Sequence, residues 1–207
     1  GKRGRLPKPG LTFWRKLPNI APTYYSNGNH EQRRKENTKK YGNVFERYQK
    51  KLREADVRFL ENDSAEFTKN GLRIMLTGLE LPMETYEKFR HMDVCGKDVA
   101  RQVGMASDGY FHILMAHNPV YFSGYKEWGA DLVLSGHLHG GIVRIPGWRG
   151  CITPQAFPFP KYSGEMTTED EHTIIVSKGL GTHTINLRLF NEPEVVVVHI
   201  HGRRRQK

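Results

Sequence analysis

Three histidine-containing motifs, each directly after a short apolar run, constrain the fold of this 207-residue chain more than any other feature. The motifs are, in order, Gly28-Asn29-His30-Glu31, His117-Asn118-Pro119 and Gly136-His137-Leu138-His139. The apolar runs before them cover residues 23–25, 113–116 and 132–134. Because parallel strands of an α/β sheet bring their carboxyl ends to one edge, side chains that follow such strands converge there. The pattern therefore predicts an α/β sheet with a polar site along one edge.

The length and composition of the chain fit one globular domain, which we place at residues 1–207. A hydrophobic content of 37% with 11% aromatic residues is that of a folded protein rather than a disordered one. No apolar run approaches the roughly 20 residues that cross a bilayer. Cys95 and Cys151 are too few for a disulfide framework, and two buried thiols are favoured over one bridge.

The formal net charge of +10 comes from the two ends of the chain. Residues 1–16 and 203–207 carry ten Lys and Arg side chains and no acid, so the remainder is formally neutral. Two interpretations stay open: solvated termini, which we favour, or contact with an anionic membrane surface. No aromatic residue interleaves with the basic residues at the carboxyl end, so specific nucleic-acid binding is not expected.

The periodicity of the chain predicts alternating strands and helices, followed by consecutive strands. Helices are expected over 41–55 and 98–105, and strands over 21–26, 57–60, 73–79, 111–116, 131–135, 173–177, 185–189 and 194–200. The charged stretch 32–40 is expected to be a surface loop, and 144–164, rich in proline and glycine, a long irregular loop. This order of elements is typical of a two-sheet α/β sandwich.

The chemistry of the three motifs favours a metal site. Imidazole nitrogen together with amide or carboxylate oxygen suits Zn, Mn and Fe. Taken singly, Asn29 could be an ordinary turn residue and His117 a polar cap on a core strand. The ordered set of three motifs after strands favours metal ligands over both alternatives.

In this order and spacing the motifs resemble the later motifs of the calcineurin-like metallophosphoesterases, a superfamily of dinuclear metal hydrolases. The resemblance implies that Asn29, His117 and His137 bind the second metal ion and that His139 binds the first. It implies that His30 touches the substrate phosphate and assists the leaving group without binding metal. The implied reaction is hydrolysis of a phosphomonoester or phosphodiester by a hydroxide that bridges two divalent or trivalent ions of Mn, Fe or Zn.

Two further motifs of that family, Asp-x-His and Gly-Asp-x-x-Asp, do not occur in the 207 residues, and the chain begins with Gly1. We therefore expect an N-terminally truncated domain that lacks its first strand-helix-strand unit and supplies most of one metal site only. Asp131 opens a strand instead of ending it, so we expect it to be structural. The alternative to an enzyme is a non-catalytic binding module on the same scaffold, since carboxylate ligands of the first metal are missing.

Three softer signals resemble a bacterial subgroup that is often tethered to the membrane by an N-terminal helix. They are Gly140-Gly141, Phe159-Pro160-Lys161-Tyr162 and Ser177-Lys178-Gly179-Leu180-Gly181. Two locations remain open on this basis, the cytoplasm or the membrane surface through a segment preceding Gly1.

Overall fold

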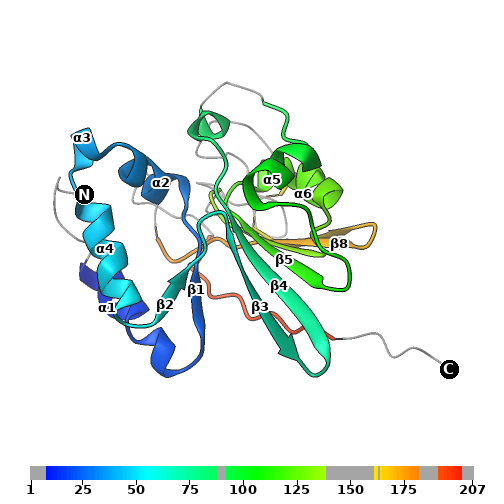
Figure 1. The fold of residues 1–207 in the computed structure, drawn as a ribbon, viewed down its shortest axis with the longest axis horizontal. Coiled ribbons are helices and arrows are strands. Elements are labelled where there is room, and N and C mark those ends of the chain that lie inside the picture. Colours follow the sequence, from blue (N-terminus) through cyan, green and yellow to red (C-terminus); the bar gives the residue numbers. More distant parts are fainter. Residues whose placement is uncertain (1–7, 88–91, 139–160, 163, 182–190, 202–207) are drawn as a thin grey trace.

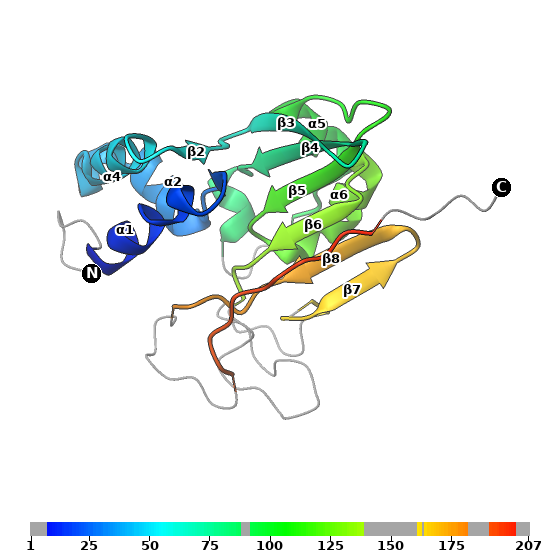
Figure 2. The ribbon, with the colours of Figure 1, turned by 90° about the horizontal axis from the view of Figure 1, so that it is seen from below.

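The computed structural model describes residues 8–87, 92–138, 161–162, 164–181 and 191–201. Within them the chain forms two sheets flanked by helices, which confirms the predicted α/β class with two sheets (Figure 1). One sheet has two parallel strands and the other has six strands in the order β3-β4-β5-β6-β8-β7 (Figure 2). None of the helices in the described ranges is long and apolar enough to span a bilayer.

The smaller sheet pairs β1 (Thr23–Tyr25) with β2 (Val57–Phe59), and helices gather around it. The helices and the short 3-10 turn of this part are α1 (Lys8–Trp14), η1 (Leu17–Asn19), α2 (Asn29–Glu36), α3 (Thr38–Tyr41) and α4 (Val44–Arg53). The helix expected over 41–55 is confirmed as α4, whose apolar side chains are buried against Val57 and Phe59. Aromatic rings fill this cluster, with Tyr25 stacked on Phe59 at a centroid distance of 4.7 Å.

The charged stretch 32–40 is not the loop that the sequence predicts. Residues 32–36 belong to α2, and residues 38–40 belong to α3. The face of α2 that is buried is polar, because Asn29 and Gln32 are its buried residues. Gln32 Nε2 donates to Leu81 O at 2.8 Å, so a hydrogen bond attaches the helix to the segment that follows β4, where an apolar stripe would be usual.

Four parallel strands form the centre of the large sheet, and an antiparallel strand closes each edge. The bounds are β3 (Asp63–Lys69), β4 (Leu72–Leu79), β5 (Phe111–Ala116), β6 (Leu132–Ser135), β7 (Met166–Glu169) and β8 (His172–Val176). The edge strands β3 and β7 were not predicted. Asp131 precedes β6 and its Oδ2 accepts from His112 N at 2.7 Å, which confirms a structural role at the amino ends of the strands.

Helices α5 (Gly96–Val103) and α6 (Phe122–Trp128) cover one face of the large sheet (Figures 1 and 2). The main core lies between them and the sheet, where Phe122, Tyr125 and Val99 pack on Leu114 and Val133. A second cluster covers the opposite face of the sheet. Two 3-10 turns, η2 (Met83–Tyr86) and η3 (Pro119–Tyr121), follow β4 and β5 on the edge where these strands end.

The strand expected over 194–200 is wrong, because the described residues 191–201 contain no assigned strand. The strand expected over 185–189 and most of the loop expected over 144–164 lie outside the described residues. Residues 1–7 of the basic amino end and all of 203–207 also lie outside them.

Candidate active site

Two of the predicted site histidines meet at the carboxyl edge of the large sheet. His117 follows the last residue of β5, and His137 comes two residues after the end of β6. Because β5 and β6 are neighbouring parallel strands, their ends lie side by side. The imidazole rings of His117 and His137 are in edge contact, with centroids 5.1 Å apart and planes at 70°. The convergence that the sequence predicted is thus present for this pair.

The backbone at His137 adopts an uncommon conformation. Its φ is +63°, and Leu138 N donates to Gly136 O at 2.7 Å, closing a three-residue turn around the histidine. Turns of this kind with positive φ at a non-glycine centre are rare and strained. Gly136 N in turn donates to His117 O at 3.2 Å, which ties this turn to the end of β5. The imidazole of His137 is therefore presented from a fixed backbone position.

The Gly28-Asn29-His30-Glu31 motif reaches the same edge through Gly28. A Cβ atom built at Gly28 would lie 2.9 Å from His117 Cε1 and 3.0 Å from His117 Nε2, closer than side chains tolerate. Only glycine lets this turn approach the imidazole so closely. Asn29 follows as the first residue of α2 and is buried, with an exposed fraction of 8%. The turn thus places Gly28, the residue that directly precedes Asn29, against His117.

His30 differs from its neighbour because it is exposed at the surface of α2. Desolvation of the ring lowers its pKa below the ordinary value of 6.5, and the nearby charges of Arg33 and Arg34 lower it further. The imidazole is therefore neutral at pH 7 and presents one N–H donor and one acceptor nitrogen. This state suits a hydrogen bond to a phosphoryl oxygen better than proton donation.

Tyr86, a buried residue of η2, contacts both histidines and was missed by sequence reasoning. Its ring centroid lies 5.4 Å from that of His137 and 6.2 Å from that of His117. Burial raises the pKa of its phenol, so the group stays protonated. No local pattern around Tyr86 signalled this contact, since it depends on how the chain after β4 turns back toward β5 and β6.

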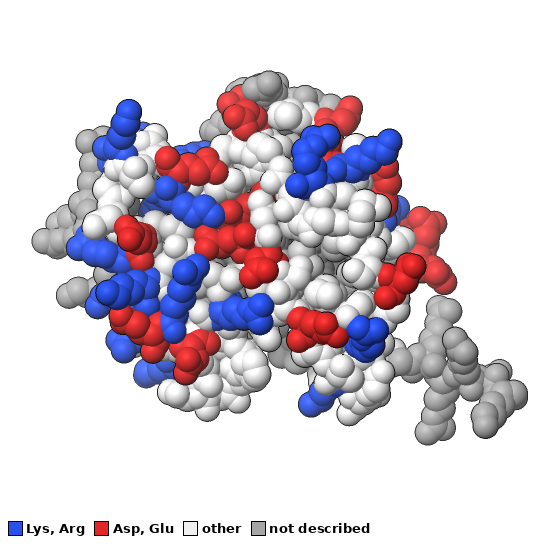
Figure 3. Space-filling view, viewed as in Figure 1, with Lys and Arg blue, Asp and Glu red and all other residues white. Residues whose placement is uncertain are grey.

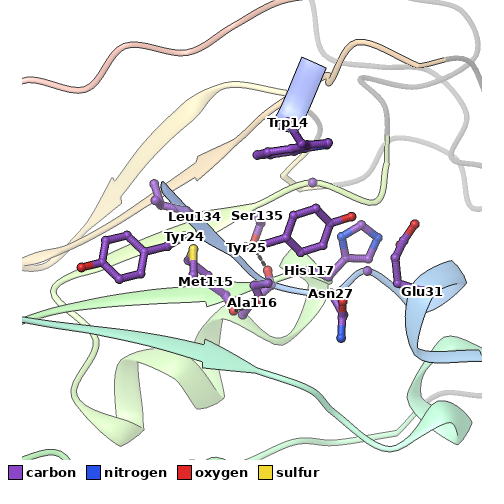
Figure 4. Close-up of a pocket in the computed structure, with 13 residues that line it drawn as sticks. Trp14, Tyr24, Tyr25, Asn27, Glu31, Met115, Ala116, His117, Leu134 and Ser135 are labelled. Carbon is purple, nitrogen blue, oxygen red and sulfur yellow. Dashed lines mark hydrogen bonds between the residues drawn. The ribbon is translucent and has the colours of Figure 1, made fainter. Parts of the chain in front are cut away.

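A cavity of about 370 Å³ opens beside His117 (Figure 4). Figure 4 shows His117 and Glu31 at one end of this cavity and Tyr24 at the other, with Trp14 above. Its lining comes from the ends of β1, β5 and β6 together with α1 and α2; the residues are Trp14, Tyr24, Tyr25, Ser26, Asn27, Gly28, Glu31, Met115, Ala116, His117, Leu134, Ser135 and Gly136. Desolvation raises the pKa of the Glu31 carboxyl, with smaller opposing effects from hydrogen bonds and Arg34.

The donor set at this edge fits one divalent ion in its chemistry. Two imidazoles and the amide oxygen of Asn29 form a nitrogen and oxygen set that suits Zn, Mn or Fe. Within the described part of the chain, no group of three or more His, Cys, Asp and Glu side chains could hold a metal ion. His139, the predicted ligand of the first ion, lies outside the described residues.

Comparisons with known proteins point to one family. Residues 4–141 match the model of the family described as calcineurin-like phosphoesterase. The chain is 36% identical over 92 residues to an uncharacterised metallophosphoesterase, YkuE, of Bacillus subtilis, covering 44% of the chain and 31% of that protein. It is 41% identical over 91 residues to an uncharacterised metallophosphoesterase of Aquifex aeolicus, covering 44% of the chain and 33% of that protein.

A longer match is to the uncharacterised protein YpbG of Bacillus subtilis, which is 29% identical over 148 residues, covering 69% of the chain and 48% of that protein. No solved structure gives a significant match. The chain therefore spans about a third to a half of the length of these curated relatives. The match over residues 4–141 covers more than half of the chain and includes all three histidine motifs. This chain accordingly belongs to the calcineurin-like phosphoesterase family.

Proposed function

We propose that this chain forms part of a metal-dependent phosphoesterase that hydrolyses a phosphomonoester or a phosphodiester. The observation that carries the proposal is the pair of imidazoles from adjacent parallel strands, 5.1 Å apart, with the Gly28-Asn29 turn against one of them. Family membership supports a phosphoester as the substrate class. The metal dependence and the roles of single residues are our proposal.

In this proposal His117, His137 and Asn29 hold one divalent ion, and His139 contributes to a second. Such ions would polarise the phosphoryl group and lower the pKa of water toward neutrality. The rest depends on side chains of the chain itself. Tyr86 packs against both imidazoles and limits the orientations that their rings can take. His30, neutral and exposed, donates an N–H to a phosphoryl oxygen and so orients the substrate.

The proposal is tested with His117→Ala and His137→Ala in the complete protein, and His199→Ala serves as the control. His199 is an exposed histidine of the extended carboxyl segment, and its ring stacks on His201. We expect each site variant to lose metal-dependent hydrolysis of an aryl phosphate and an aryl phosphodiester, and the control to retain it. Binding of Mn²⁺ or Zn²⁺ is measured beside turnover by calorimetry.

Two results separate the proposal from its alternative. Metal binding without turnover on either ester, with several divalent ions, would establish a non-catalytic binding module on this scaffold. Full activity in His117→Ala or His137→Ala would show that the site lies elsewhere in the protein.

A further inference from the structure

A partly buried charged network adjoins the turn that carries Asn29 and His30. Asn27 is 2% exposed, and its Nδ2 donates to Glu61 Oε1 at 2.8 Å and to Glu80 Oε1 at 2.6 Å. Glu61 follows the end of β2, and Glu80 follows β4 and is 8% exposed. Both protons of the amide are used by carboxylates, so the orientation of Asn27 is determined by the network. The residue next to Gly28 is thus attached to both sheets.

Lys35 completes the network from the last turn of α2. Its Nζ lies 2.9 Å from Glu61 Oε1 and 2.5 Å from Glu80 Oε2. The same two carboxylates therefore bind α2 at its last turn through Lys35 and bind the chain just before the helix through Asn27. Figure 3 shows acidic side chains gathered near the middle of this face, with basic side chains beside them on the side of α2 and α4.

The charge of Lys35 is needed because two carboxylates converge on one amide. Arg53 also reaches Glu61, with Nη2 3.1 Å from Oε2, so Glu61 keeps a cation when Lys35 is absent. The described contacts give Glu80 no cation other than Lys35. A largely buried carboxylate that loses its only cation is strongly disfavoured and is expected to move toward water. This movement would release the hydrogen bond that holds Asn27.

We propose that Lys35 and Glu80 are positioning residues for the Gly28-Asn29-His30 turn, acting through Asn27. Neither side chain is among the ligands or substrate contacts described above. Their effect is to hold the backbone of the turn at the distance from His117 at which Asn29 and His117 can bind the same metal ion. This inference rests on the proposed function for its kinetic consequence, while its structural part can be measured independently.

The test compares four variants of the complete protein: Lys35→Met, Lys35→Arg, Lys35→Met with Glu80→Gln, and Lys51→Met as the control. Lys51 is an exposed lysine of α4. The backbone amide signals of Gly28 and Asn29 are followed by NMR, together with metal affinity and kcat on an aryl phosphate. Loss of a residue that orients a metal ligand lowers metal affinity or activity about 10-fold to 100-fold.

We expect Lys35→Met to move the amide signals of Gly28 and Asn29 and to lower metal affinity and kcat about 10-fold to 100-fold. Lys35→Arg, which keeps the cation, should recover most of the loss. So should the double variant, because the side-chain amide introduced by Glu80→Gln accepts from Asn27 without a negative charge. Lys51→Met should equal the wild type. Recovery in the double variant distinguishes positioning by charge from a general loss of packing, even if Lys35→Met alone is poorly folded.

The inference is overturned if the Gly28 and Asn29 signals stay in place in Lys35→Met, whatever the activity. It is equally overturned if the signals move while metal affinity and kcat remain at the wild-type level. A wild-type protein without metal binding or turnover would count against the proposed function alone, and the shift of the amide signals would still decide whether Lys35 positions the turn.

Discussion

Replacing Gly28 by alanine should disturb His117 while leaving the fold intact. The added Cβ would lie 2.9 Å from His117 Cε1, whereas ordinary contact begins at 3.4 Å, so the imidazole has to move by about 0.5 Å. The φ of Gly28 is −87°, which alanine adopts without strain, so the effect is steric and local. Overpacking of this kind costs about 1–3 kcal/mol, within the stability margin of a domain.

The functional effect should be larger than the structural one. Metal-ligand distances are defined to about ±0.2 Å, so a shift of about 0.5 Å would take a metal-binding His117 out of its range. A displacement of about 1 Å costs roughly 100-fold in rate, and half of it about tenfold. We therefore expect Gly28→Ala to lower metal affinity and kcat about tenfold, measured by calorimetry and by turnover of an aryl phosphate.

Gly136→Ala provides the matched control on the same imidazole. Its added Cβ would lie 3.8 Å from His117 Cε1 and Nδ1, an ordinary contact that displaces nothing. Metal affinity and kcat in this variant should stay within about twofold of the wild type. Equal effects of the two substitutions, or none from Gly28→Ala, would refute the argument that the close approach of Gly28 positions His117.

Two further outcomes are expected. Tyr86→Phe should retain metal affinity because its ring still packs on His117 and His137. Tyr86→Ala should lower the melting temperature and the metal affinity together, since truncating a buried aromatic ring costs about 3–5 kcal/mol. Equal metal affinity in the two variants would show that the ring contact has no role. The carboxyl of Glu169 has its pKa lowered from 4.5 to about 2 by Lys161, Tyr162 and Lys126. Because the folded pKa is the lower one, its contribution to stability is present above pH 4.5 and is lost as the pH falls toward 2. Urea unfolding at successive pH values should therefore show Glu169→Gln to be less stable than the wild type at pH 6, and the difference in stability should vanish near pH 2. A difference in stability that is independent of pH would contradict the ion-pair explanation.

The parts of the fold that sequence reasoning predicted are those in which local pattern and tertiary burial agree. The strand over 111–116 was predicted with the observed bounds of β5, and the spacing of apolar residues in α4 matched its buried face. Strand β3 was missed because only Ala65 of its seven residues is buried, which leaves little alternation to detect. Helix α2 was missed because its buried face is polar.

At the site, too, local sequence pattern predicted some features and missed others. The positions of His117 and His137 at neighbouring strand ends follow from the motifs themselves. The contacts that hold the site together join distant parts of the chain, such as Lys35 with Glu80 and Asn27 with Glu80, 45 and 53 residues apart. Glu80 did carry a usable signal, since it follows β4 on the edge of the large sheet where the histidines lie, whereas Glu61 follows β2 of the smaller sheet. No local pattern, however, indicates that they face one another.

The left-handed backbone of His137 has a consequence for how this protein responds to selection. A non-glycine residue held at a φ of +63° costs of order 1–3 kcal/mol, and glycine would relieve that cost while removing the imidazole. Directed evolution for heat resistance alone would therefore drift toward glycine at position 137, and the resulting proteins would be more stable but would lack the imidazole that we propose as a metal ligand. Evolution under a requirement for metal binding would keep the histidine and gain its stability at other positions.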